Sequence, residues 1–408
     1  MTNSRFRSGR TPTGASIYAS IDAAKADARR AGHEVIDLSA GSSDLPPPPE
    51  AVEALATSAL DASTYKYCMK SGTLPLLEAA VAWYKEQYGV QLSATDQALA
   101  LIGAQEGLGH LLLSAADSGD GIVMSDIGFP SYFGAVQVAG LHPIYVPLDA
   151  ETLLPDFDQL SAEQLRAGRA KVMLLNYPNN PTSATADDAF FERAIAFAKE
   201  HNLLLIHDSP YVDLTFDQDH APSPLALPGG LECCVEIFTF SKSYHVPGLR
   251  LGFMLGNADA IAALAGVKAV MDFNQWAGIQ RAGIACLALP RHRLRSDAAT
   301  WQARARALSA ALLQQAGWDI SMPRSCMYLW GRLPVALRGS VDDVRFAVEL
   351  LTREGVAVAP GSAFGPGGTG FVRFALVAPE DVLVEVAQRV GRVLAALAAE
   401  AEAGRTAG

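Results

Sequence analysis

One lysine stands in a setting that suits covalent chemistry. Lys242 lies in the segment 239–250 (TFSKSYHVPGLR), directly after an apolar run, and Arg250 follows eight residues later. A lysine in a loop of this kind can form a Schiff base with a carbonyl compound, and a fixed cation nearby can bind an anion. For an isolated Ser-Lys pair, a solvated surface turn would be the plainer interpretation.

Three further segments favour the chemical interpretation. They are 176–182 (NYPNNPT), 208–211 (DSPY) and 371–374 (FVRF), which contains Arg373. In this order and spacing the motifs resemble those of the class I aminotransferases, enzymes of the aspartate-aminotransferase fold (fold type I) that use pyridoxal 5'-phosphate (PLP). The resemblance runs from about Ile17 to beyond Arg373.

The resemblance implies a role for each polar residue around the cofactor ring. Lys242 matches the lysine that holds PLP as an aldimine and later moves a proton on the substrate. Asp208 matches the carboxylate that keeps the pyridine nitrogen protonated. Tyr211 and Asn180 match the donors to the phenolic oxygen of PLP, and Arg373 matches the arginine that binds the substrate α-carboxylate. The family often has a cis bond before the proline of this motif, so Asn180–Pro181 is expected to be cis.

The resemblance also implies a phosphate site and a substrate pocket. A turn that follows the apolar run 99–102 and opens a helix matches the phosphate cradle of the family. The cofactor-binding residues expected beyond the ring contacts are Gly103, Ala104, Gln105, Thr239 and Arg250, with Phe129 stacking on the ring and Tyr67 reaching the phosphate bound in the other subunit. The expected substrate-binding residues are Gly41, Asn180, Arg373 and Tyr18. One departure from the family pattern is Ser183, which stands where the motif usually has glycine.

Alternating strand and helix patterns must position these residues. Short apolar runs at 122–124, 144–146, 171–175, 203–206 and 235–238 are separated by helical patterns, such as 187–201. This alternation predicts an α/β domain with a mostly parallel sheet sandwiched by helices. Asn176, Asp208 and Thr239 each follow the end of a predicted strand, which is where ligands bind in open sheets of this kind.

From about residue 286 the pattern changes to long helices and short strands, which predicts a smaller α+β domain. We therefore expect an N-terminal arm and part of the small domain at 1–50, a large PLP-binding domain at 51–285, and a small C-terminal domain at 286–408. Helices are expected over 50–60, 296–315 and 382–401.

The composition and net charge of the chain argue against several classes of binding partner. The chain has 408 residues and a formal net charge of −11, which argues against nucleic acid and anionic membranes as partners. No apolar run is long enough to span a bilayer, and no secretory signal is expected. Five cysteines without C-x-x-C spacing indicate reduced thiols in a soluble, cytoplasmic enzyme. The histidine spacing predicts no metal site.

The combined prediction is a homodimeric PLP-dependent aminotransferase of amino-acid metabolism with shared active sites. It would move an amino group between an L-amino acid and a 2-oxo acid by a ping-pong mechanism through the Lys242 aldimine. Another PLP-dependent reaction on the same fold, catalysed by a β-lyase, decarboxylase or oxidase, stays open, because the cofactor-binding residues would be the same. A PLP-sensing regulator with a DNA-binding domain is not expected, since only about sixteen residues precede the family-like region.

Overall fold

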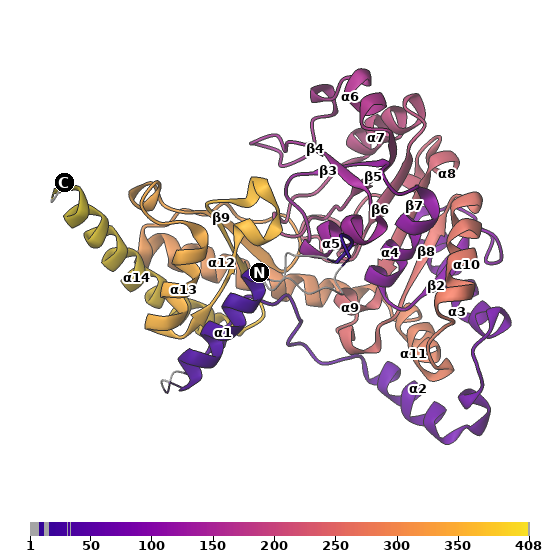
Figure 1. Cartoon of the computed structure of the whole chain (residues 1–408). Coiled ribbons are helices and arrows are strands. Elements are labelled where there is room, and N and C mark those ends of the chain that lie inside the picture. The colour runs from indigo at the N-terminus through magenta and orange to yellow at the C-terminus, as the bar shows by residue number, and fades with distance from the viewer. Residues whose placement is uncertain (1–7, 12–15, 31, 33, 407–408) are drawn as a thin grey trace.

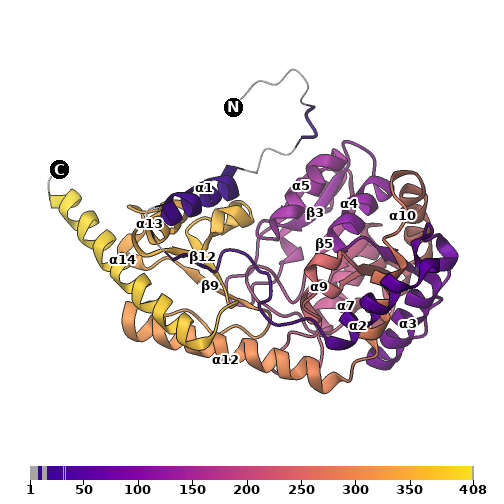
Figure 2. The same cartoon turned by 90° about the horizontal axis from the view of Figure 1, so that it is seen from below.

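The computed structural model describes residues 8–11, 16–30, 32 and 34–406. They form a larger part built on a seven-stranded sheet and a smaller part built on a three-stranded sheet (Figures 1 and 2). Helix α12 (Arg291–Ala316) runs along both parts, as the view in Figure 2 makes clear. None of the described helices is long and apolar enough to cross a membrane.

The large sheet is parallel except for one strand. In spatial order its strands are β2 (Ala98–Leu101), β8 (Gly252–Gly256), β7 (Cys234–Thr239), β6 (Leu204–Asp208), β5 (Ala170–Leu175), β3 (Gly121–Ser125) and β4 (His142–Val146). Strand β8 is antiparallel to both of its neighbours, and all other pairs are parallel. The predicted mostly parallel sheet is confirmed, and its central strands are buried, as their apolar sequences require.

Helices cover both faces of this sheet, and successive strand residues point to opposite faces. One core contains Val172 and Ile206 and packs under α4 (Ala104–Ala115), α5 (Pro130–Ala139) and α10 (Ala258–Met271). The other contains Met173 and Leu205 and packs under α3 (Lys70–Tyr88), α7 (Asp188–Glu200) and α11 (Ala277–Leu287). The remaining helices of this part are α2 (Pro49–Leu60), α6 (Ala162–Ala167), α8 (Gly230–Cys233) and α9 (Phe240–Ser243).

The smaller part has a separate core around Trp301, Phe346 and Phe374. Its antiparallel sheet has the order β11-β12-β9, and a short parallel pair joins β1 to β10. The elements are β1 (Ile36–Asp37), β9 (Tyr328–Arg332), β10 (Val356–Ala357), β11 (Ala359–Pro360), β12 (Phe371–Ala375), α1 (Ser16–Arg30), α13 (Asp343–Glu354) and α14 (Glu380–Thr406). Helix α1 lies against α13 and so belongs to the smaller part (Figure 1).

The predicted helices are present with shifted ends. Helices α2 and α7 match the ranges expected from sequence, whereas α12 and α14 are longer than expected at both ends. Helix α12 begins directly after Pro290, which occupies the N-cap position.

Candidate active site

Three neighbouring strands bring polar residues to one edge of the large sheet. Strand β5 is followed by Asn176, β6 ends at Asp208, and β7 ends at Thr239, three residues before Lys242. The side chain of Asn176 donates to the carbonyl oxygen of Asp208 at 2.8 Å, which ties two of the strand ends together. These strand ends line a cavity of about 490 Å³ between the two parts of the chain.

Most of the expected site residues line this cavity. They are Gly41, Ala104, Gln105, Phe129, Asn180, Asp208, Tyr211, Thr239, Lys242, Arg250 and Arg373. Gly103 lies directly behind the lining, against Arg250. Tyr67 is 82% exposed and lies outside the cavity of its own chain. The side chain of Tyr18 lies outside the described residues.

Lys242 belongs to the one-turn helix α9 and lines the cavity. The hydroxyl oxygen of Thr239 accepts a hydrogen bond from the backbone N–H of Ser241 at 3.2 Å and so caps α9. The Nζ atom of Lys242 donates to the carbonyl oxygen of Gly41, which comes from the N-terminal part of the chain. The amine therefore points into the cavity, where a carbonyl compound can reach it.

Asp208 has one carboxylate oxygen that is satisfied and one that is not. Its Oδ2 accepts a hydrogen bond from the hydroxyl of Tyr132 at 2.6 Å, and its Oδ1 is buried without a hydrogen-bond partner among the described residues. Burial raises the pKa of Asp208 to about 6, against the opposing effects of the Tyr132 hydrogen bond and the nearby His207. A buried carboxylate with a free oxygen fits a protonated ring nitrogen, such as that of PLP.

The hydroxyl group of Tyr211 can donate a hydrogen bond. Its hydroxyl lies 2.8 Å from the hydroxyl of Tyr328, and both side chains are buried. Burial, with a smaller contribution from Tyr328, raises the pKa of Tyr211 well above its usual value. The phenol therefore keeps its proton, and it can stabilise an oxygen anion in the cavity.

Arg373 is buried between two aromatic rings. Its guanidinium carbon lies 4.3 Å from the ring centroid of Tyr328 and 4.6 Å from that of Phe364. One terminal nitrogen donates to Asn180 Oδ1 at 2.8 Å and the other to the carbonyl oxygen of Ser39 at 2.6 Å. The rings fix the plane of the guanidinium, and a planar fork of this kind suits a carboxylate.

The first turn of α4 lies next to Arg250, and both line the cavity. Gly103 is the N-cap of α4 and has a φ of 78°, and a Cβ atom at this position would lie 2.7 Å from Nη2 of Arg250. Only glycine therefore allows the guanidinium to lie this close to the start of the helix. Free N–H groups at a helix start, together with a cation, fit a phosphate group.

The NYPNNPT segment forms a buried turn held by its own side chains. Asn176 Oδ1 accepts from the backbone N–H of Asn180 at 3.0 Å, and the Asn180–Pro181 peptide bond is cis, as expected. Ser183 has a φ of 58°, a conformation that favours glycine, which explains why the family usually has glycine there. The serine hydroxyl donates to the carbonyl oxygen of Tyr328 at 2.9 Å, so its side chain has a partner in this conformation.

Two tyrosines of the site were not identified from the sequence. Tyr132 lies three residues after Phe129 at the start of α5, and their rings make an edge contact at 5.6 Å. The i, i+3 spacing within one helix turn was a signal that could have found it. Tyr328 lies on β9 of the smaller part, and no local motif points to it. The position of Tyr328 in the site depends on how the smaller part packs against the larger part.

The chain is similar over most of its length to several known proteins. The profile of a family described as aminotransferase class I and II matches residues 33–390. The LL-diaminopimelate aminotransferase of Moorella thermoacetica is 35% identical over 379 residues, covering 93% of this chain and 95% of the relative. The glutamate-pyruvate aminotransferase AlaC of Escherichia coli is 36% identical over 360 residues, covering 88% and 86%. A solved structure of a probable N-succinyldiaminopimelate aminotransferase from Thermus thermophilus has 49% identity and a TM-score of 0.88, and covers 93% of this chain and 100% of that one.

Proposed function

The chain belongs to the family of class I and II aminotransferases, and from this premise we propose how its residues act. It is a PLP-dependent aminotransferase, and it has the fold of that family, as expected from the sequence. The observation that supports the residue assignments is that Lys242, Asp208 and Arg373 line one cavity. PLP, when bound, supplies an aldehyde for the amino group and a ring that takes up electrons from the substrate.

The residues that line the cavity have separate roles in the proposed reaction. Arg373 binds the α-carboxylate of the substrate and so orients its Cα atom. Lys242 Nζ takes the proton from Cα, and the carbonyl oxygen of Gly41 orients the amine beforehand. Asp208 holds a proton on the ring nitrogen, while Tyr211 and Asn180 donate to the phenolic oxygen. Gly103, Ala104, Gln105, Thr239 and Arg250 bind the phosphate, and Phe129 packs on the ring.

We propose a substrate of the diaminopimelate type. Two of the three relatives above are named for diaminopimelate or its succinyl derivative, including the structure with 49% identity. Among the described residues that line the cavity, the side-chain cations are Lys242, Arg250 and Arg373, and each already has a role. A distal carboxylate of the substrate would therefore be met by a residue outside this lining, and the partner subunit is the proposed source.

The surface around Tyr67 supports a homodimer. Large apolar side chains are exposed there and on the neighbouring end of α10 with the segment that follows it. They are Leu60, Tyr65, Tyr67, Met69, Val270, Met271 and Phe273. The rings of Tyr67 and Phe273 lie 5.6 Å apart, so the two segments are adjacent. A second copy of the chain is the occupant that we propose for this patch, because Tyr67 would then reach the phosphate site of that copy. The five free cysteines support the cytoplasm as the compartment.

A half-reaction screen tests the function and the substrate together. The holoenzyme is mixed with one amino acid at a time, without a 2-oxo acid, and the visible absorbance of the cofactor is followed. We expect LL-diaminopimelate or its N-succinyl derivative to convert the cofactor from its aldehyde to its amine form, and a 2-oxo acid to reverse the change. Conversion by L-alanine or L-aspartate alone would refute the substrate proposal. Release of ammonia would indicate a β-lyase.

Mixing two impaired variants tests the shared site. Lys242→Ala and Tyr67→Ala are expected to be weak alone, and activity should return when they are mixed and allowed to exchange subunits, because a mixed dimer contains one complete site. No recovery in a mixture with proven exchange would refute the role of Tyr67 across the interface.

A further inference from the structure

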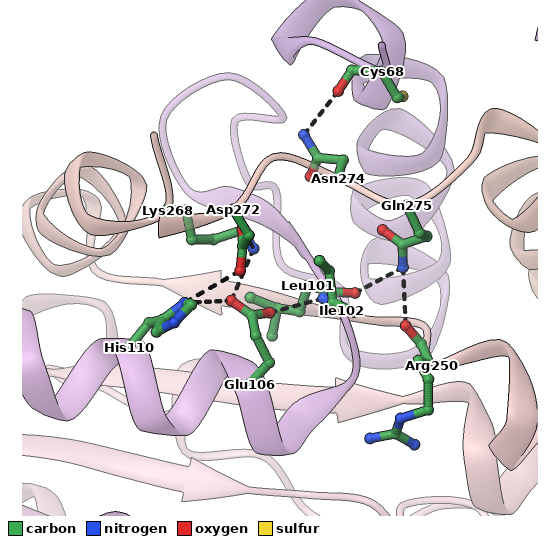
Figure 3. Close-up of polar contacts among 10 residues, drawn as sticks. All are labelled: Cys68, Leu101, Ile102, Glu106, His110, Arg250, Lys268, Asp272, Asn274 and Gln275. Atoms are coloured by element: carbon green, nitrogen blue, oxygen red, sulfur yellow. Dashed lines mark hydrogen bonds and ion pairs between the residues drawn. The ribbon is translucent and has the colours of Figure 1, made fainter. Parts of the chain in front are cut away.

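A group of buried and half-buried ionisable side chains lies next to the proposed phosphate site (Figure 3). Lys268 on α10 has a side chain that is only 6% exposed, and its Nζ lies 2.8 Å from Glu106 Oε1 and 2.9 Å from Asp272 Oδ1. His110 faces the same two carboxylates, at 2.6 Å from Glu106 and 3.5 Å from Asp272. We call Lys268, Glu106, Asp272 and His110 the charge cluster.

Glu106 stands in the first turn of the helix whose N-terminus faces the phosphate. It is the third residue of α4, and its Oε2 accepts the backbone N–H of Ile102 at 2.8 Å. A carboxylate so close to the phosphate-binding N–H groups repels a phosphate dianion through protein, where screening by water is weak. The ammonium group of Lys268 is placed to cancel this charge.

The segment that follows α10 extends this support to the other parts of the phosphate site. Gln275 Nε2 donates to the carbonyl oxygens of Leu101, at the end of β2, and of Arg250, each at 3.0 Å. Arg250 has left-handed backbone angles, φ 49° and ψ 52°, so its backbone benefits from a fixed partner. Asn274 Nδ2 donates to the carbonyl oxygen of Cys68 at 3.0 Å, next to Tyr67 (Figure 3).

The cluster has a composition that also suits a metal ion. Glu106, His110 and Asp272 have ligand atoms within 4.8 Å of one another. The ammonium group of Lys268 already bonds to both carboxylates, and a cation in the same place would be repelled by it. The lysine therefore fills the role that a metal ion would have.

We propose that Lys268 is a positioning residue for the cofactor phosphate. It neutralises Glu106 at the start of α4 and fixes Asp272, from which the segment to Gln275 supports the Arg250 backbone. This inference rests on the proposed phosphate site at Gly103–Gln105 and Arg250. It implies that Lys268 controls the affinity for PLP without contacting it.

The test compares single and double variants by their dissociation constants for PLP, measured from the cofactor absorbance on adding PLP to the apoenzyme. Lys268→Met is expected to weaken PLP binding on the order of tenfold, because the charge of Glu106 is then uncompensated. Glu106→Gln keeps the hydrogen bond to Ile102 and removes the charge, so the double variant with Lys268→Met should recover most of the affinity. Lys268→Arg should stay close to the native protein.

A matched control and a second readout separate positioning from general damage. Lys25 is similarly buried and pairs with Asp37 at 2.8 Å and with Asp22 at 3.5 Å, so Lys25→Met should lower thermal stability without changing PLP affinity. Inorganic phosphate should raise the melting temperature of the native apoenzyme, and a higher phosphate concentration should be needed for Lys268→Met. The turnover number at saturating PLP should fall less than the affinity.

Three results would overturn parts of this account in distinguishable ways. Native affinity in Lys268→Met, or a double variant as weak as the single one, would refute the positioning role. If Lys268→Met does not fold, Gln275→Ala is measured in its place, and native PLP affinity in that variant would refute the support of Arg250. If Arg250→Ala also binds PLP with native affinity, the proposed phosphate site itself is wrong.

Discussion

Replacing Tyr132 by phenylalanine should make PLP binding depend more strongly on pH. The hydroxyl of Tyr132 donates to Asp208 Oδ2 at 2.6 Å and stabilises the ionised carboxylate, whose pKa is about 6. PLP with a protonated ring nitrogen binds best when this carboxylate is ionised. Without the tyrosine hydroxyl, the carboxyl group of the apoenzyme should hold its proton to higher pH, and binding PLP must then displace that proton.

The size of the effect follows from the strength of the hydrogen bond. A hydrogen bond to a charged group contributes about 1.5–3 kcal/mol, which corresponds to about 1–2 pKa units. With a rise of about 1.5 units from the native value, the dissociation constant for PLP should increase about 16-fold at pH 6. At about pH 9 the carboxyl group is ionised in both proteins, so the two dissociation constants should be nearly equal.

The assay is a titration of apoenzyme with PLP, followed by absorbance, at several pH values between about 5.5 and 9. Taking the ratio of the variant to the native constant cancels the pH dependence of the cofactor and of Lys242. Tyr88→Phe is the matched control, because its hydroxyl donates to the carbonyl oxygen of Ala221 at 2.8 Å and it does not line the cavity. A ratio for Tyr132→Phe that is independent of pH, or larger at pH 9 than at pH 6, would refute the reasoning.

Three further changes test other parts of the site. Gly103→Ala should raise the dissociation constant for PLP roughly tenfold, because the added Cβ atom reaches Arg250. Gly89 has a similar φ with open space around it, so Gly89→Ala should only lower stability by ~1–2 kcal/mol. Equal effects of the two variants on PLP affinity would contradict this prediction. Arg373→Lys should lower kcat/KM for the amino donor roughly 10- to 100-fold, since a lost charge-assisted hydrogen bond costs about 1.5–3 kcal/mol, and an unchanged kcat/KM in steady-state assays would disagree. As the pH rises from below 3.8 to above 6, the native apoenzyme should lose up to about 3 kcal/mol of unfolding free energy relative to Asp208→Asn. The reason is that a carboxyl group with a raised pKa stabilises the folded state only while it is protonated. Urea unfolding at both ends of this pH range measures the difference, and no relative loss would disprove the prediction.

The sheet edge could be predicted from the sequence because its strands are consecutive neighbours. Strands β5, β6 and β7 lie side by side in a parallel arrangement, so the residues that follow them meet at one edge. Asn176, Asp208 and Lys242 are therefore brought together by local patterns: an apolar run, its end, and a polar motif directly after it. The family resemblance added the chemistry of the cofactor to this geometry.

Contacts between the two parts of the chain could not be predicted in the same way. Tyr328 reaches Tyr211 only because β9 of the smaller part lies next to the segment that follows β6, and no spacing in the sequence encodes this contact. The pair Lys268 and Asp272 has the i, i+4 spacing typical of an exposed helical ion pair. The burial of Lys268 depends on α4, which supplies its partner Glu106. Glu106 lies 162 residues before Lys268 in the chain.

The hydrogen bonds of Arg373 and Lys242 to the segment around Ser39 and Gly41 have a consequence for the exchange of reactants. In the proposed binding mode, a substrate carboxylate competes at the two terminal nitrogens of Arg373 with Asn180 and the carbonyl oxygen of Ser39, whereas Nε has no hydrogen-bond partner among the described residues. The net gain in free energy is then the difference between two sets of hydrogen bonds, and it is smaller than either set alone. In a ping-pong reaction the first product must leave before the second reactant binds. Competition from protein acceptors for the N–H groups of Arg373 then shortens the time that each reactant stays bound.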